Sequence, residues 1–239
     1  MSFDDLSITW LGHATFLFEY ADSTILLDPW LEGNPKCPDE YTDVEPDAVL
    51  ITHGHADHVG NVFEVASRTD GPIAGIFDLT SWLDAKGIDE NRLRGMNKGG
   101  TQVLDDLDVT ITMTDAHHSS SFIEEDGIPV YLGEPAGYVI RFGDGPSVYA
   151  AGDTCLFGDM EWIGELWDAE IAILPIGDHF TMDPEQAAHA TKLVGAHTVV
   201  PCHWGTFPAL TGTPDAFERQ LRAVGASAEM CALEPGETF

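Results

Sequence analysis

The sequence predicts an α+β fold, an αββα sandwich in which two packed mixed β-sheets are flanked by helices. Short apolar segments recur along the chain, and each is followed by a turn bearing Gly, Asp or His and then by a loop or helix. These segments gather in two blocks, one early and one late, with helical patterns between and after them. Because a sheet must bury its apolar face against another layer, this order favours two sheets packed together with helices outside. A chain of 239 residues can bury one large core, so we expect residues 1–239 to form a single domain.

The first block of predicted strands lies in the N-terminal third of the chain. Apolar and β-branched stretches predict strands at residues 6–10, 15–20, 24–27, 48–52 and 73–76. A loop is expected at 31–46, which is rich in Pro, Gly, Asn and Asp, and a turn at 95–100. Helical patterns cover residues 59–67 and 79–86, and Gly87 ends the second of them.

The second block follows the same rules. Strands are predicted at residues 109–114, 136–142, 147–151, 171–175 and 198–201. The strands on either side of the Gly- and Pro-rich turn at 143–146 should pair as a hairpin. Helices are expected at 160–167, at 184–194 behind an N-cap at Asp183, and at 214–224. The polar stretch 119–135 is a candidate active-site loop.

The charge balance is strongly acidic: 41 Asp and Glu against 10 Lys and Arg give a formal net charge of −31. The acids are spread along the whole chain, which indicates a property of the entire surface rather than an acidic tail. Nucleic-acid partners are not expected, because phosphate binding needs basic stripes. High charge repels itself unless salt screens it, so we interpret the chain as halophilic.

Location and redox state follow from simpler features. No apolar run reaches the length of a membrane span, so none is expected. The N-terminus, Met1 to Asp5, is acidic and lacks the basic and apolar regions of a signal peptide, which favours a cytoplasmic protein. The cysteines at 37, 155, 202 and 231 show no C-x-x-C pair, so we expect free thiols that behave as small buried groups.

Four potential metal ligands, His53, His55, Asp57 and His58, lie within six residues. They follow the predicted strand at 48–52, and open α/β sheets hold their ligands at the carboxyl ends of strands. Imidazole and carboxylate together suit zinc, iron, manganese or nickel. The small residues between them let the backbone curl, so the side chains can point at one centre. We predict a metal site here rather than a solvated polar turn.

Further ligand-type residues end strands or form turns elsewhere, at His118, Asp153, His179 and His203. Two metal ions a few Å apart need about six or seven protein ligands, and these residues with the first motif supply that number. His13 is either a turn histidine or a group beside the substrate or behind a ligand. Asp28 either belongs to a strand-end turn or hydrogen-bonds a ligand histidine.

These motifs carry a family resemblance. His-Gly-His-Ala-Asp-His at 53–58, a histidine before Ser-Ser at 118–120, Ala-Gly-Asp-Thr at 151–154 and Pro-Cys-His-Trp at 201–204 together resemble the metallo-β-lactamase fold superfamily. Residues 11–15, 27–31, 118–121 and 175–182 look like the UPF0173 group of metal-dependent hydrolases, related to the ascorbate-phosphate lactonases. The resemblance spans nearly the whole chain.

The resemblance implies a ligand set for two divalent ions. His53, His55 and His118 would hold one ion. Asp57, His58 and His203 would hold the second, and Asp153 would bridge them. Zinc is the expected metal, with manganese, iron or nickel as alternatives. His118 is preferred over His117 because it directly precedes the Ser-Ser pair, and neighbours in an extended strand point to opposite faces.

The activity implied is that of a dinuclear metal-dependent hydrolase, in which a metal-bridging hydroxide attacks an ester, lactone or phosphoester bond. Asp57 would orient the nucleophile as well as ligate, and His179 would contact the substrate or protonate the leaving group. The substrate would be a small molecule selected by residues 31–46 and 119–135. A homo-oligomer is compatible with this interpretation.

Two alternatives stay open, a di-iron redox protein and a non-catalytic metal-binding protein of the same fold. Di-iron oxygen reductases usually carry glutamate where this chain has His55, and they need a flavin domain for which the chain has no room. These features favour hydrolysis. A complete ligand set argues against a non-catalytic role.

The acidic surface generates a prediction about salt. In molar salt the Debye length falls to about 3 Å, so repulsion among the acids largely disappears. We expect the melting temperature to fall as potassium chloride is lowered from molar to millimolar concentration. An unchanged melting temperature, measured by circular dichroism, would reject the halophilic interpretation.

Overall fold

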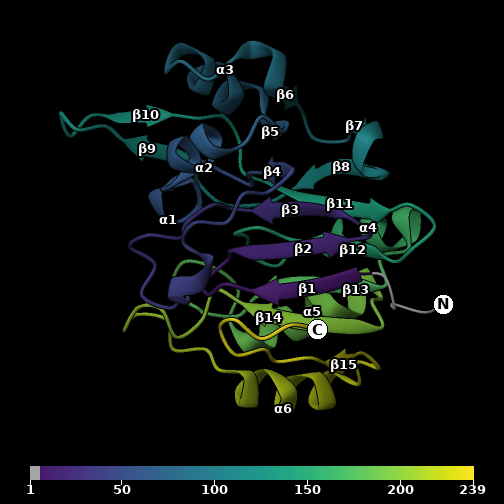
Figure 1. Ribbon diagram of the computed structural model, residues 1–239. Helices are drawn as coiled ribbons and strands as arrows, with labels where there is room; N and C mark the ends of the chain where they lie inside the picture. The colour runs from purple at the N-terminus through teal and green to yellow at the C-terminus, as the bar shows by residue number, and fades with distance from the viewer. Residues whose placement is uncertain (1–5) are drawn as a thin grey trace.

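The strands of the first half of the chain form a mixed sheet in the computed structural model, which describes residues 6–239 (Figure 1). In spatial order they are β1 (Leu6–Trp10), β2 (Phe16–Tyr20), β3 (Ser23–Leu27), β4 (Ala48–Leu50), β5 (Ile73–Ile76) and β6 (Leu93–Met96). The first three strands pair antiparallel, and β3 to β6 pair parallel. The inference from the acidic N-terminus concerns residues 1–5, which lie outside the described residues.

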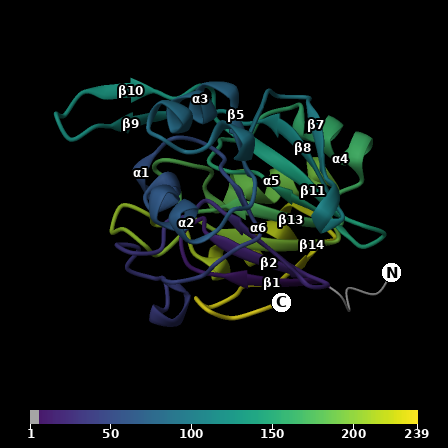
Figure 2. The same ribbon diagram turned by 45° about the horizontal axis from the view of Figure 1, so that its top comes forward.

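The later strands form a second mixed sheet behind the first (Figure 1). Its order is β15 (Glu229–Met230), β14 (Thr198–Cys202), β13 (Ile171–Pro175), β12 (Ser147–Ala150), β11 (Ala136–Phe142), β8 (Val109–Asp115) and β7 (Thr101–Leu104). The predicted hairpin is present as the antiparallel pair β11 and β12, and β12 to β15 run parallel. A separate hairpin of β9 (Ser121–Ile123) and β10 (Pro129–Tyr131) projects from one end of the molecule (Figures 1 and 2).

Helices cover the outer faces of the two sheets (Figure 2). They are α1 (Ala56–Val59), α2 (Val62–Arg68), α3 (Phe77–Ala85), α4 (Met160–Trp167), α5 (Pro184–Val194) and α6 (Pro214–Val224). Helix α3 packs on β5 and β6, whereas α5 packs on β13 and is flanked by α4 and α6. Helix α5 begins as predicted, because the Asp183 side chain accepts a hydrogen bond from the Gln186 amide and Pro184 occupies its first turn. None of the helices within residues 6–239 is both long and apolar enough to cross a bilayer.

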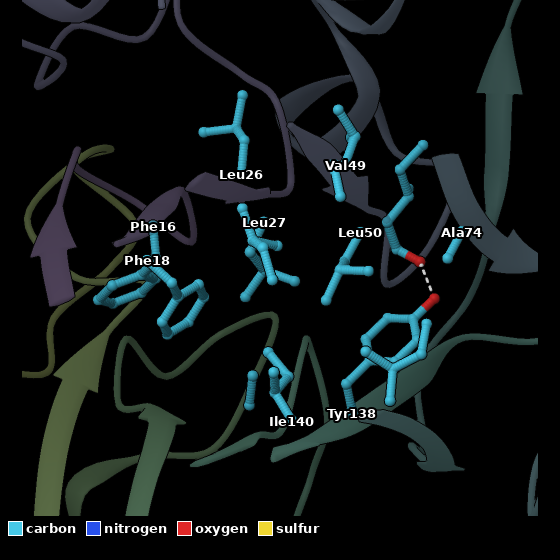
Figure 3. Packing of buried hydrophobic residues seen from close by; sticks show 14 of the residues in the cluster. Phe16, Phe18, Leu26, Leu27, Val49, Leu50, Ala74, Tyr138 and Ile140 are labelled. Atoms are coloured by element: carbon cyan, nitrogen blue, oxygen red, sulfur yellow. Dashed lines mark hydrogen bonds between the residues drawn. The ribbon is translucent and has the colours of Figure 1, made fainter. Parts of the chain in front are cut away.

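Inward-facing side chains of the two sheets form the larger core (Figure 3). Leu27 and Leu50 of the first sheet lie opposite Tyr138 and Ile140 of β11 (Figure 3). Val139, between those two, points to the other face and joins a second core with α4, α5 and α6. The alternation follows from the two-residue repeat of a strand, so β11 holds the sheets together on one face and the helices on the other.

One buried hydrogen bond ties the second sheet to the segment just before the metal motif. The Tyr138 hydroxyl donates to the Ile51 carbonyl over 2.9 Å (Figure 3). Burial raises the pKa of this hydroxyl above its usual value, so it keeps the proton that it donates. Ile51 lies two residues before His53, and its position is therefore set by both sheets.

The C-terminal segment covers the free edge of β1. Ile8 and Phe239 exchange two backbone hydrogen bonds of 3.0 and 2.9 Å, and the Trp10 amide donates to the Glu237 carbonyl. An edge strand otherwise presents unpaired backbone groups to neighbouring molecules. The last residues of the chain are thus part of the first sheet's hydrogen bonding.

The predicted two-sheet sandwich with outer helices is confirmed, and the differences are local. The helix expected at 59–67 is α2, which starts at Val62, and the separate short helix α1 precedes it. The turn expected at 95–100 starts only after β6 ends, and residues 119–135 contain the β9–β10 hairpin instead of an open loop. Strands β6, β7, β9, β10 and β15 were not predicted. Gly95 interrupts the apolar pattern of β6, so this segment has little strand preference of its own. It forms a strand because it pairs with β5.

Candidate metal centre

Strand ends from both sheets meet at one edge of the sandwich, beside α1 and the base of the β9–β10 hairpin (Figures 1 and 2). Asp28 directly follows β3, and His53 comes shortly after β4. His118, Asp153 and His203 follow β8, β12 and β14 in the second sheet. This is the carboxyl edge at which open α/β sheets hold their ligands.

Metal-ligating atoms of these residues form three overlapping groups within residues 6–239. In each group, one nitrogen or oxygen per residue lies within 4.8 Å of the others. The groups are His53, His55 and His118; His53, His58 and Asp153; and His13, Asp57, His58 and His203. Tetrahedral ligands about 2.0–2.1 Å from zinc lie roughly 3.4 Å from one another, so the spacing suits shared ions. The structure thus brings together all seven residues expected as ligands, and His13 with them.

Asp153 lies between the groups. Its Oδ2 is 3.0 Å from Nε2 of His203 and 3.5 Å from Nε2 of both His58 and His118. Burial alone would raise the pKa of this carboxyl, but His203 and His58 hold it well below its usual range. An ionised carboxylate touching histidines of different groups has the position that a bridging ligand needs.

Asp28 lies behind the histidines and fixes their tautomers. Its fully buried carboxylate accepts hydrogen bonds from the Thr52 amide and hydroxyl and from Nδ1 of His58, each 2.7 Å long. Since the Thr52 hydroxyl gives its proton to Asp28, its oxygen accepts from Nδ1 of His53 at 3.0 Å. Both rings therefore carry hydrogen on Nδ1, which leaves Nε2 of each as the atom that would ligate an ion.

Asp57 is paired with His13. Nε2 of His13 lies 3.2 Å from Asp57 Oδ2. Burial would raise the pKa of Asp57, but the hydrogen bond from His13 and the nearby His58 hold it well below its usual range. Burial lowers the pKa of His13 to about 4, so this ring is neutral at neutral pH.

The chemistry of the donor set fits divalent transition metals. Imidazole nitrogens and carboxylate oxygens are the ligands of zinc, manganese, iron and nickel sites. Within residues 6–239, the buried atoms His58 Nε2, Asp153 Oδ1 and His203 Nδ1 make no hydrogen bond. Buried polar atoms normally have partners, and three of the eight unpartnered ones in the described chain belong to candidate ligands, which suits residues that bind a metal ion.

Two glycines are required by close packing at the centre. A Cβ on Gly54 would lie 2.6 Å from the Leu132 side chain, so this glycine lets the segment after β10 close over the motif. Gly152, directly before Asp153, has a left-handed backbone (φ +62°), and a Cβ there would lie 2.6 Å from the Ala136 carbonyl. These two positions hold the motif and the central carboxylate in place.

Two other candidate histidines lie outside the groups. His117 is exposed; its Nε2 lies 3.2 Å from Asp115 Oδ2, and its ring stacks on Phe157 with centroids 4.7 Å apart. His179 is also exposed, and its ring meets Phe180 edge to face at 4.4 Å. The contacts described for His179 reach none of the groups. Its turn nevertheless lies beside the centre, because a Cβ on Gly177 would be 2.0 Å from the His203 carbonyl.

The cysteines are free within the described chain, but they are not uniformly buried. Cys202, next to His203, is buried, and Cys37 and Cys231 are half-buried. Cys155 is exposed, which corrects the expectation of a small buried group. The turn after Asp153 leaves its side chain on the surface, while its amide donates to the His117 carbonyl.

Sequence reasoning assigned no role to several residues that support the centre. Thr52 links Asp28 to His53, Ser119 Oγ lies 3.3 Å from Nε2 of His55, and Ser120 Oγ accepts from the Gly54 amide. Only the serines could have been suspected, from their place next to His118.

A cavity of about 560 Å³ opens beside His118, lined also by Lys98, Asp115, Ala116, His117 and Glu134.

Comparison with known proteins identifies the family. Residues 23–204 match the β-lactamase superfamily domain. The chain belongs to this superfamily. A UPF0173 metal-dependent hydrolase of Herpetosiphon aurantiacus is 47% identical over 236 residues, which cover 98% of this chain and 97% of that protein. Another, of Methanopyrus kandleri, is 43% identical over 234 residues, covering 98% and 99%. The chain is thus a member of the superfamily's UPF0173 metal-dependent hydrolases.

A solved structure agrees with this assignment. Igni18, a metallo hydrolase of the hyperthermophilic archaeon Ignicoccus hospitalis, has a TM-score of 0.84 and 39% identity, covering 98% of this chain and 97% of that one. The fold predicted from the motifs, the metallo-β-lactamase fold of this superfamily, is confirmed.

The adjacent histidines generate a prediction. His118 belongs to a ligand group, whereas His117 is bound to Asp115 and Phe157. His118→Ala should weaken metal binding by more than the roughly 10–100-fold that follows loss of a group supporting a ligand. His117→Ala is the matched control and should bind metal as the wild type does. Metal titration of both variants checks this, and the opposite result would show that His117 is the ligand.

Proposed function

We propose that this chain is a dinuclear metal-dependent hydrolase, with residues 1–239 acting as one domain. The observation that carries the proposal is the position of Asp153, whose Oδ2 approaches His118 on one side and His58 and His203 on the other. His53, His55 and His118 would hold the first ion. Asp57, His58 and His203 would hold the second, with Asp153 shared between the two. Zinc is the metal we expect, with manganese, iron or nickel as alternatives.

When bound, the ions supply a water of lowered pKa and a Lewis acid for the oxygen that gains charge. The chain's own residues hold that arrangement in place. Asp28 sets the tautomers of His58 and, through Thr52, of His53, so that both present lone pairs to the ions. Asp57 is half-buried and ionised, and it would orient the attacking group as well as ligate.

The substrate we propose is a small molecule with an ester, lactone or phosphoester bond. The cavity beside His118 is the candidate binding place, and it carries both Lys98, paired with Asp115 at 2.5 Å, and Glu134. Charges of both signs in the cavity suit a polar substrate. A net charge of −31 opposes polyanions such as nucleic acids.

The redox alternative is not supported by the residue at the second ligand position of the motif at 53–58, where a glutamate would be expected. His55 stands there, and its Nδ1 lies 3.0 Å from Nε2 of His53 in the first group. An imidazole at this position suits a hydrolytic zinc site. Iron bound after anaerobic purification, with visible absorption, would favour the redox alternative instead.

The proposed function is tested by metal analysis combined with a panel of esters, lactones and phosphodiesters in molar potassium chloride. We expect two ions per chain and turnover of at least one class of substrate. Asp153→Ala should remove at least one ion and most of the activity. Two ions retained in that variant would contradict the bridging role. Two ions in the wild type with no turnover on the whole panel would favour a non-catalytic metal-binding protein.

His179 generates a separate prediction about chemistry. It lies on an exposed turn next to the backbone of His203, and we propose that it protonates the leaving group. His179→Ala should keep both ions and the melting temperature while kcat falls, since general acid catalysis contributes about 10²–10⁴-fold. Esters of p-nitrophenol, whose leaving group needs no proton, should lose less. An unchanged kcat for every substrate, with or without a lower melting temperature, would reject this role.

A further inference from the structure

His13 is the unassigned member of the centre. It lies in the group with Asp57, His58 and His203, and its ring centroid is 3.9 Å from that of His203. It is fully buried and has a left-handed backbone (φ 55°), a conformation that is uncommon for non-glycine residues. Its burial and its place in this group raise the question whether it ligates an ion or supports a residue that does.

The backbone of His13 is held from two directions. Its carbonyl accepts a hydrogen bond from the His203 amide at 2.8 Å and another from Nε1 of Trp10 at 3.0 Å. Trp10 in turn stacks on Trp204, directly after His203, with centroids 5.2 Å apart. His13 is therefore fixed to the loop that carries one proposed ligand while its ring reaches another, Asp57.

Both ring nitrogens of His13 already have partners. Nε2 faces Asp57 Oδ2 at 3.2 Å, and Nδ1 faces the Thr206 hydroxyl at 3.0 Å. An ionised carboxylate only accepts hydrogen bonds, so Nε2 must carry the hydrogen at this contact. The Thr206 hydroxyl lies nearer to Nδ1 than to any other acceptor described for it, so we take Nδ1 as the atom to which it donates. The alternative acceptor for that hydroxyl, the Trp204 carbonyl, is more distant at 3.4 Å.

We propose that Thr206 and His13 form a donor chain that holds the Asp57 carboxylate for the second ion, so that His13 is a positioning residue and not a ligand. Thr206 donates to His13, and His13 donates to Oδ2 of Asp57, so Oδ1 would remain available to ligate an ion. This donor chain resembles the hydrogen-bonded series Asp28, Thr52 and His53. It differs in supporting a carboxylate ligand instead of an imidazole. The inference rests on the proposed dinuclear function.

Thr206→Val tests the chain without touching a proposed ligand. Valine matches threonine in shape and lacks the hydroxyl, so Nδ1 of His13 loses its hydrogen-bond partner and the ring is no longer held against Asp57 from behind. We expect affinity for the second ion to fall about 10–100-fold, as for other residues that orient ligands, while the first ion binds unchanged. The readout is a two-step zinc titration of metal-free protein, with no substrate present. Thr206→Ser keeps the hydroxyl and should restore the affinity.

Two further variants separate positioning from general structure. Thr211→Val is the matched control, because it removes an exposed hydroxyl bonded to Asp178, outside the ligand groups. It should bind both ions as the wild type does. The variant His13→Gln lacks the ring that contacts the Thr206 hydroxyl. Adding Thr206→Val to it should therefore cause no further loss of affinity for the second ion. Equal additional loss in that background would show that Thr206 acts only on the fold and would overturn the proposal.

The remaining outcomes are also decisive. Thr206→Val with wild-type affinity for both ions would overturn the donor chain and leave the dinuclear function standing. His13→Ala that loses the second ion as completely as Asp57→Ala would show that His13 coordinates the ion, and this too would overturn the proposal. A wild-type chain that takes up only one ion would instead contradict the proposed function itself.

Discussion

Asp28 places its carboxylate where no water reaches, and three donors converge on it, two from Thr52 and one from His58. A buried carboxylate with fewer partners would be costly, because each unsatisfied buried group costs about 1–3 kcal/mol and a charged one more. The loop from β4 to α1 therefore has one favourable arrangement. In that arrangement His53 and His58 present the same type of nitrogen to the same region. The rest of the centre is built around these two rings.

The second sheet supplies the candidate ligands that the first sheet lacks. The first sheet carries the His-rich motif, whereas His118, Asp153 and His203 come from loops that follow strands of the second sheet. The Tyr138–Ile51 hydrogen bond and the packing of Leu132 on Gly54 keep the two sets in register. Because rigid strands fix the start of each loop, no long flexible segment has to position a ligand.

Features encoded locally could be predicted from the sequence, and features that depend on distant contacts could not. The cap at Asp183 and the His-rich turn are local patterns, and the structure has α5 and the groups of candidate ligands at those places. Strand β6 contains Gly95, where any larger residue would clash, because a Cβ there would lie 2.7 Å from the Thr80 side chain of α3. Only the tertiary structure reveals that contact.

The break between α1 and α2, which delays the start of the helix predicted at 59–67, has a similar origin. A Cβ on Gly60 would lie 2.5 Å from the Ala56 carbonyl and 3.0 Å from the Trp30 ring, so tryptophan packing from another segment shapes this turn. Thr206 and His13 are 193 positions apart, and no pattern in the sequence connects them. Their link depends on the sheets having already docked.

The separation of the ligands along the chain also bears on how the protein matures. Residues from position 53 to position 203 must meet before the groups exist. Closing such long loops is slow, because their entropy is lost before the contacts form. We therefore expect an ion to bind after the sandwich has assembled, apart from weak binding at the motif between His53 and His58, and to lock that assembly rather than guide it.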